Sequence, residues 1–141
     1  MASKPDKVVS ATYHLHINEA QARAISHACE ILARLGMGQF KDALECLPLK
    51  EYAPDGWWDD MEGIAHILKK HTTVMHGVGA YHSIRSHKTS DTSKTARDLY
   101  QVIRHRLAWD AEPNWNPMSV VFDQPMRTSP EPLAWIERNA K

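Results

Sequence analysis

The feature that most constrains the fold is a long run of apolar residues at helical spacing in the first third of the chain. Steps of three and four separate the members of this stripe, which are Ile25, Cys29, Leu32, Gly36, Phe40, Ala43 and Leu47. This spacing places them on one face of an α-helix, so it predicts a helix with one buried side. Asn18 and Gln21 precede the stripe as a capping box, and Pro48 ends it. Gly36 and Gly38 weaken a helix, so they indicate either a bend or the close approach of another backbone.

Two further helices and two strands complete the expected fold. The long helix covers about 19–47, a shorter helix 59–71, and a second long helix 92–109, whose inward residues are Ala96, Leu99, Ile103 and Leu107. Residues 8–17 and 118–123 are rich in β-branched and aromatic side chains, which favours strands. The sequence therefore predicts an α+β fold, in which a small antiparallel β-sheet from N- and C-terminal strands packs with two long α-helices and a shorter one.

Length and composition predict one domain over residues 1–141, with residues 1–7 flexible, because 141 residues suffice for a single hydrophobic core. The apolar share of 43% argues against disorder. Leu133, Trp135 and Ile136 of the Pro-interrupted tail are expected to pack on the rest of the domain.

The formal net charge is zero, so no global field would draw the protein to DNA or to a membrane surface. Any nucleotide must then be held by a local cluster of cations.

The N-terminus and the cysteines predict a soluble, cytoplasmic protein. The first ten residues lack the apolar run of a signal peptide, and no segment reaches the length of a membrane span. Cys29 and Cys46 are the only cysteines and have no CxxC spacing, so free thiols are expected rather than a disulfide.

The strongest candidate for a binding site is the basic stretch 82–106. Its cations and histidines are Arg85, Lys88, Lys94, Arg97, Arg104, Arg106, His82, His87 and His105. Arg97 and Arg104 stand two helical turns apart on one face, where their guanidinium groups can bind two phosphates. The competing interpretation is a solvated helix whose arginines pair with acids of segment 51–62.

Residues near this stretch and on the first helix are further candidates for a binding site. Tyr81 and Tyr100 can supply flat faces for a base. Arg106 falls on another side of the helix and is expected to pair with an acid. The polar side of the first helix carries Arg23, His27, Glu30, Arg34, Lys41 and Glu45. There Arg34 either binds an anion or forms an intrahelical pair with Glu30.

Motifs of catalysis and metal binding are missing from the sequence. Nine histidines are present, but no HExxH and no Cys-His ligand spacing occurs. The chain has no GxSxG elbow, P-loop or GxGxxG. We therefore expect no enzyme, no metal and no cofactor.

Two segments, ILARLGMGQFKDAL (31–44) and ARDLYQVIRHRLAWD (96–110), resemble the phage family of Thoeris anti-defence sponges, first described as cyclic ADP-ribose scavengers. The similarity covers about residues 12–126. The resemblance implies a phage protein of the bacterial host cytoplasm, with a small antiparallel sheet and two principal helices. Family members sequester glycocyclic ADP-ribose signals made by bacterial TIR-domain proteins without cleaving them, in pockets completed by two protomers.

The resemblance also implies residues of a cyclic ADP-ribose site. Tyr81 matches an aromatic stacking residue before the last helix, and Arg104 matches a late-helix arginine that contacts phosphate. Arg97 and His105 are further candidates for this site. Polar residues of the loop 83–91 are expected to contact the ligand.

The resemblance also implies a second site. Some family members are hexamers that bind cyclic trinucleotides of the CBASS defence system at sites separate from the cyclic ADP-ribose site. Arg34 matches the arginine just before the MGQF segment at that site, and His27 is the second candidate. The expected partners are therefore a cyclic ADP-ribose-type nucleotide, cyclic tri- or dinucleotides, and further copies of the chain, as a dimer or a hexamer built as a trimer of dimers.

Two other functions stay open. The first is a small histidine-dependent phosphodiesterase that degrades the same class of signal. The second is an interaction protein whose Trp-rich surface binds a partner protein and no nucleotide.

Overall fold

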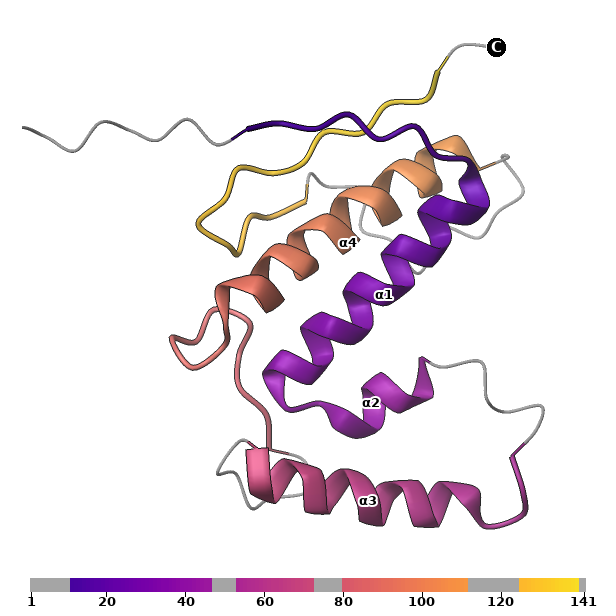
Figure 1. The fold of residues 1–141 in the computed structure, drawn as a ribbon, viewed down its shortest axis with the longest axis vertical. Coiled ribbons are helices and arrows are strands. Elements are labelled where there is room, and N and C mark those ends of the chain that lie inside the picture. Colours follow the sequence, from indigo (N-terminus) through magenta and orange to yellow (C-terminus); the bar gives the residue numbers. More distant parts are fainter. Residues whose placement is uncertain (1–10, 47–52, 73–79, 112–124, 140–141) are drawn as a thin grey trace, which may run out of the picture.

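The computed structural model describes residues 11–46, 53–72, 80–111 and 125–139, and within these ranges the regular structure is helical (Figure 1). The helices are α1 Glu19–Met37, α2 Phe40–Glu45, α3 Trp57–Thr72 and α4 Asp91–Asp110. α1 and α4 lie side by side and antiparallel, α2 folds back at the end of α1, and α3 packs on α2 (Figure 1). No helix in the described part of the chain has the length and apolar character needed to cross a membrane.

The predicted α+β fold is wrong, because the described residues contain no β-strand. Residues 11–17 run as an extended chain (Figure 1), but Tyr13 and Leu15 are 91% and 72% exposed, so their alternation has no buried face. A pair of extended segments without an apolar face to bury is marginal as a sheet. The helix contact between α1 and α4 forms the core in its place. Residues 1–7, 8–10 and 118–123 lie outside the described residues.

The predicted long helix is divided at Gly38. Its start is confirmed, since the backbone N–H of Gln21 donates to Asn18 Oδ1 and that of Asn18 donates to Gln21 Oε1, both at 2.9 Å. Gly38 has φ 82°, a left-handed conformation that glycine adopts without strain, and the N–H of Gln39 donates to the carbonyl of Arg34 at 2.9 Å. The chain then turns into α2, which is the bend that Gly38 allows.

The face of α1 that meets α4 differs from the predicted stripe. Its buried residues are Ala22, Ser26, Ala33 and Met37, whereas Leu32 is exposed and Ile25 and Cys29 are only partly covered. α4 presents Ser93, Ala96, Tyr100, Val102, Ile103 and Ala108 among its buried residues. Small side chains on both helices let the two axes approach closely, and Ile25 and Leu32 of α1 lie at the flanks of this contact.

Gly36 marks the tightest part of this contact. A Cβ added to Gly36 would lie 1.9 Å from Ser93 Oγ and 2.4 Å from Ser93 Cβ. Ser93 is itself buried, and its hydroxyl is 2.9 Å from that of Ser90, which caps α4 by accepting the N–H of Ser93. The close-approach interpretation of Gly36 is therefore confirmed.

The other helices lie close to their predicted bounds. α3 begins at Trp57, after a turn in which Gly56 has φ 81°, and α4 exceeds its prediction by one residue at each end. Asp59 and Asp60 occupy the first turn of α3, and Lys69 and other cations occupy its last turn. This charge arrangement complements the helix dipole.

The C-terminal segment is held by polar contacts rather than by the expected apolar anchors. Trp135 is 79% exposed. Buried Asp98 of α4 instead accepts four hydrogen bonds, from the N–H and hydroxyl of Thr128 at 2.7 and 2.6 Å and from those of Ser129 at 2.9 and 2.7 Å. Burial raises the pKa of Asp98, but these hydrogen bonds together outweigh it and lower the pKa below its usual value.

Replacing Gly36 with Ala should destabilise the protein, because the new methyl group meets Ser93 and must push α1 and α4 apart. We expect a loss of about 1–3 kcal/mol in the free energy of unfolding, measured by urea denaturation. Gly63→Ala is the matched control: it lies in α3 with no atom within 4 Å of the added Cβ. That variant should gain up to about 1 kcal/mol from helix propensity. Equal stability of the two variants would contradict the close contact.

Replacing Asp98 with Asn should release residues 128–129 from α4 and lower stability by about 2–3 kcal/mol at pH 7. Because the folded-state pKa of Asp98 is lowered, its contribution is present above the unfolded pKa of about 3.9 and is lost as pH falls through the folded pKa. Denaturation of both proteins at pH 7 and pH 2.5 should show the gap shrinking in acid. A gap that stays constant would mean that the carboxylate charge is not what holds the segment.

Candidate functional site

A cavity of about 340 Å³ lies between the N-terminal half of α1 and the C-terminal half of α4. We call it the Arg104 pocket. Its lining residues are Arg23, Ser26, His27 and Glu30 from α1, Tyr100, Arg104, Leu107 and Ala108 from α4, and Ala111. Sites for small molecules have volumes of about 300–1,000 Å³, so this cavity is at the lower end of that range.

Tyr100 organises the α4 wall of the pocket. It is 8% exposed, and its hydroxyl accepts a hydrogen bond from Arg104 Nη1 at 3.0 Å. The guanidinium carbons of Arg97 and Arg104 lie 5.2 and 5.7 Å from the centre of its ring. Both distances are within the range of cation–π attraction. A buried aromatic ring therefore holds the two arginines that the sequence placed on one face.

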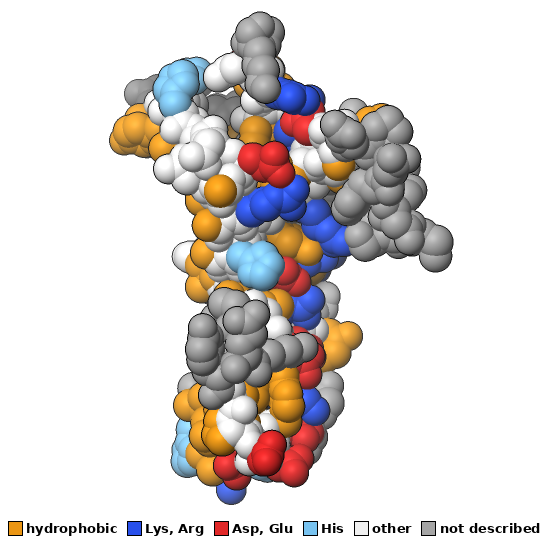
Figure 2. Space-filling view, turned by 90° about the vertical axis from the view of Figure 1, so that its right-hand side faces the viewer, with side chains coloured by type: hydrophobic (Ala, Val, Ile, Leu, Met, Phe, Trp, Pro, Cys, Tyr) orange, Lys and Arg blue, Asp and Glu red, His pale blue; other side chains and the backbone are white. Residues whose placement is uncertain are grey.

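The α1 wall carries both signs of charge. Arg23 forms an exposed ion pair with Glu19 at 2.6 Å, and such pairs contribute little, so the Arg23 side chain can turn to a ligand at small cost. His27 is exposed, and Glu30 is half-buried. Figure 2 shows the same mixture on one face of the molecule, where Lys and Arg side chains alternate with Asp and Glu. The positive charge is therefore local and does not form a broad basic surface on this face.

Arg34 does not line the Arg104 pocket and is engaged by polar neighbours. Its Nε and Nη2 donate to Glu30 Oε1 at 3.1 and 2.8 Å, and its Nη1 donates to Gln39 Oε1 at 3.3 Å. Asp42 lies 3.9 Å away. Burial lowers the pKa of Arg34, but Glu30 and the other acidic groups outweigh it and raise the pKa above its ordinary value. The structure thus contains the intrahelical pair with Glu30, and it places the other second-site candidate, His27, in the Arg104 pocket.

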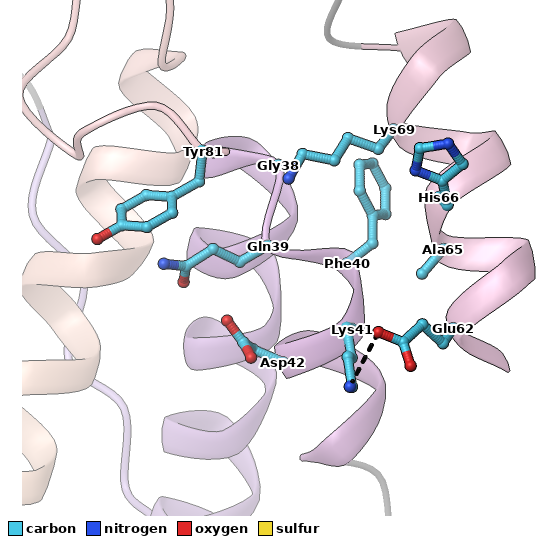
Figure 3. A pocket seen from close by; sticks show the side chains of 10 residues that line it. All are labelled: Gly38, Gln39, Phe40, Lys41, Asp42, Glu62, Ala65, His66, Lys69 and Tyr81. Atoms are coloured by element: carbon cyan, nitrogen blue, oxygen red, sulfur yellow. Dashed lines mark ion pairs between the residues drawn. The ribbon is translucent and has the colours of Figure 1, made fainter. Parts of the chain in front are cut away.

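Tyr81 belongs to a different cavity, of about 300 Å³, between α2 and α3. Figure 3 shows Tyr81 across this cleft from His66 and Lys69 of α3. The remaining lining residues are Gly38, Gln39, Phe40, Lys41, Asp42, Glu62 and Ala65, and Lys41 pairs with Glu62 at 3.2 Å. The backbone N–H of His82 donates to the carbonyl of Met37 at 2.8 Å, which holds this part of the chain at the end of α1.

The structure therefore separates residues that the resemblance grouped. His105 does not line the Arg104 pocket; its Nε2 accepts the indole N–H of Trp109 at 3.1 Å. Arg106 pairs with Asp110, as predicted. Glu62, an acid of segment 51–62, pairs with Lys41 of α2.

The polar loop before α4 is shaped by its own hydrogen bonds. Buried Thr89 donates its hydroxyl hydrogen to the carbonyl of Ser83 at 2.9 Å, and the N–H of Ser86 donates to the same carbonyl at 2.9 Å. None of the described residues 80–90 lines the Arg104 pocket. The expected contacts between this loop and a ligand stay a prediction.

Arg23 and Glu30 were not among the predicted site residues, and Tyr100 was predicted only as a flat face for a base, although signals for all three existed. Arg23 and Glu30 flank His27 at steps of four and three on one face of α1, and Tyr100 stands one turn from Arg104. What the sequence could not show is that the polar side of α1 meets the basic face of α4.

Among the residues that the structure describes, no three His, Cys, Asp or Glu side chains gather closely enough to hold a metal ion. Comparisons with known proteins return no match, since no family model, curated protein or solved structure is significantly similar to this chain.

Proposed function

We propose that this protein binds a cyclic ADP-ribose-type signalling nucleotide in the Arg104 pocket and sequesters it without cleaving it, as an anti-Thoeris sponge does. The observation that carries the proposal is that Arg104 of α4 lines the same cavity as Arg23 and His27 of α1. Guanidinium groups bind phosphate through two parallel hydrogen bonds, and a cyclic ADP-ribose carries a pyrophosphate. Arg104 is thus the principal phosphate ligand of the proposed site.

Tight sequestration favours a site whose ligand groups are already in place before binding. Tyr100 supports this requirement, because it is buried and contacts both Arg104 and Arg97. The pocket is open to solvent and small for a whole dinucleotide, so a second protomer would complete the enclosure. Exposed apolar side chains on two helices, Leu32, Leu35, Ile64, Ile67 and Leu68, support self-association as a dimer or a trimer of dimers.

The charge balance supports small nucleotides over long nucleic acids. The net charge is zero, and binding to DNA depends on many simultaneous phosphate contacts. In the proposed role the protein acts in the cytoplasm of the bacterial host, intercepts the Thoeris signal and binds no DNA.

The proposal predicts that purified protein removes cyclic ADP-ribose from solution and returns it intact after heat denaturation, as quantified by chromatography. Arg104→Ala should bind about ten- to a hundredfold more weakly, because a charge-assisted contact to phosphate is lost. Arg106→Ala is the matched control on the same helix, since Arg106 is engaged by Asp110, and it should bind normally.

Two other outcomes of that experiment would contradict sequestration. Release of a breakdown product would overturn sequestration in favour of the phosphodiesterase. No uptake at all would exclude both, and would favour an interaction protein that uses the tryptophans.

A second proposal concerns cyclic tri- or dinucleotides of CBASS, for which the resemblance offers Arg34 and His27. Arg34 contacts Gln39 and Asp42, and both line the cleft between α2 and α3. We place the second site at this cleft, with Arg34 beside it, because His27 lies in the Arg104 pocket.

If the cleft is a separate site, a cyclic trinucleotide should bind with equal affinity in the presence and absence of saturating cyclic ADP-ribose, measured by calorimetry. Gln39→Ala, at the cleft, should weaken the trinucleotide alone, whereas Arg104→Ala should weaken cyclic ADP-ribose alone. Mutual exclusion of the two ligands would show that they share one site.

A further inference from the structure

We propose that Glu30 makes the Arg104 pocket selective for nucleotides with a free ribose hydroxyl, by accepting a hydrogen bond from that hydroxyl and repelling a phosphate in its place. This inference rests on the proposed function, since it concerns the ligand of the same pocket. It starts from an acidic side chain that a site built only for phosphate would not contain.

Glu30 is held firmly at the pocket wall. Its side chain is 14% exposed, and both hydrogen bonds from Arg34 end on Oε1. No donor among the described residues bonds to Oε2, so this oxygen keeps its capacity to accept. The paired guanidinium of Arg34 offsets the desolvation cost of this largely buried carboxylate.

An ionised carboxylate has two properties that matter here. It only accepts hydrogen bonds, so it matches the hydroxyl groups of a ribose, and acidic residues serve this purpose in dinucleotide-binding folds. It also repels phosphate, since two like charges in one pocket are unfavourable. Glu30 therefore sets which part of a nucleotide lies beside it.

The helix geometry separates this carboxylate from the phosphate-binding end. α1 and α4 are antiparallel (Figure 1), and Gly36 lies against Ser93. Arg104 is eleven residues beyond Ser93, so it lies near the level of residue 25 on α1. Glu30 is five residues from that level, which is about 7–8 Å along the helix. This spacing suits a ligand with a phosphate at one end and ribose hydroxyls at the other.

The test compares cyclic ADP-ribose with its 2′-phosphate derivative by calorimetry, using the full chain. Wild-type protein should bind the unphosphorylated ligand about tenfold or more tightly than the derivative, because Glu30 repels the added phosphate. Glu30→Gln should reduce this ratio toward one. Glu45→Gln, the same change at an exposed position outside the pocket, should keep the wild-type ratio.

Glu30→Asp is the control for a change in folding, because it keeps the negative charge. It should keep most of the affinity ratio between the two ligands, whereas Glu30→Gln should lose it. An unchanged ratio in Glu30→Gln, with cyclic ADP-ribose still bound through Arg104, would overturn the role of Glu30 and leave the proposed function standing. Failure of wild-type protein to bind either ligand would overturn the proposed function together with this inference.

Discussion

The close contact between α1 and α4 is the constraint on which the rest of the structure depends. Gly36 leaves no room for a side chain where α1 meets Ser93, and small residues such as Ala33 and Ala96 continue the contact along both helices. The same contact determines what lies at the other end of the pair. With the axes antiparallel, the polar positions of α1 that follow its N-terminus face the C-terminal half of α4 and form the walls of the Arg104 pocket.

The pocket combines groups that would be ordinary surface residues on separate helices. Arg23, His27 and Glu30 on an isolated helix form a solvated polar face. Beside Arg104 and buried Tyr100 they become a site with cations at one end and a carboxylate at the other. The local grouping of charge, in a chain with no net charge, fits the proposed capture of a small anionic nucleotide.

Local signals in the sequence predicted the positions of the helices well, but they did not predict how the helices pack. The capping box at Asn18 forms as predicted, because it involves atoms only a few residues apart. The cap at Ser90 and the turn before α3 are equally local features. The predicted sheet failed since strand propensity has meaning only where a partner strand and a buried face exist. The buried stripe of α1 was misplaced because close packing favours alanine and serine over leucine, a choice that depends on the neighbouring helix.

The sequence by itself determined where α1 begins and, to within two residues, where α3 and α4 begin. It also showed that Gly36 and Gly38 have special roles and that Arg97 and Arg104 share a face. Helical periodicity and capping are short-range effects, so they can be read from residues a few positions apart. Only the tertiary structure decided that Arg104 and Glu30 line one pocket and that Tyr81 lies in another cavity. Those outcomes depend on which faces of distant helices come into contact, and that is decided by packing over the whole chain.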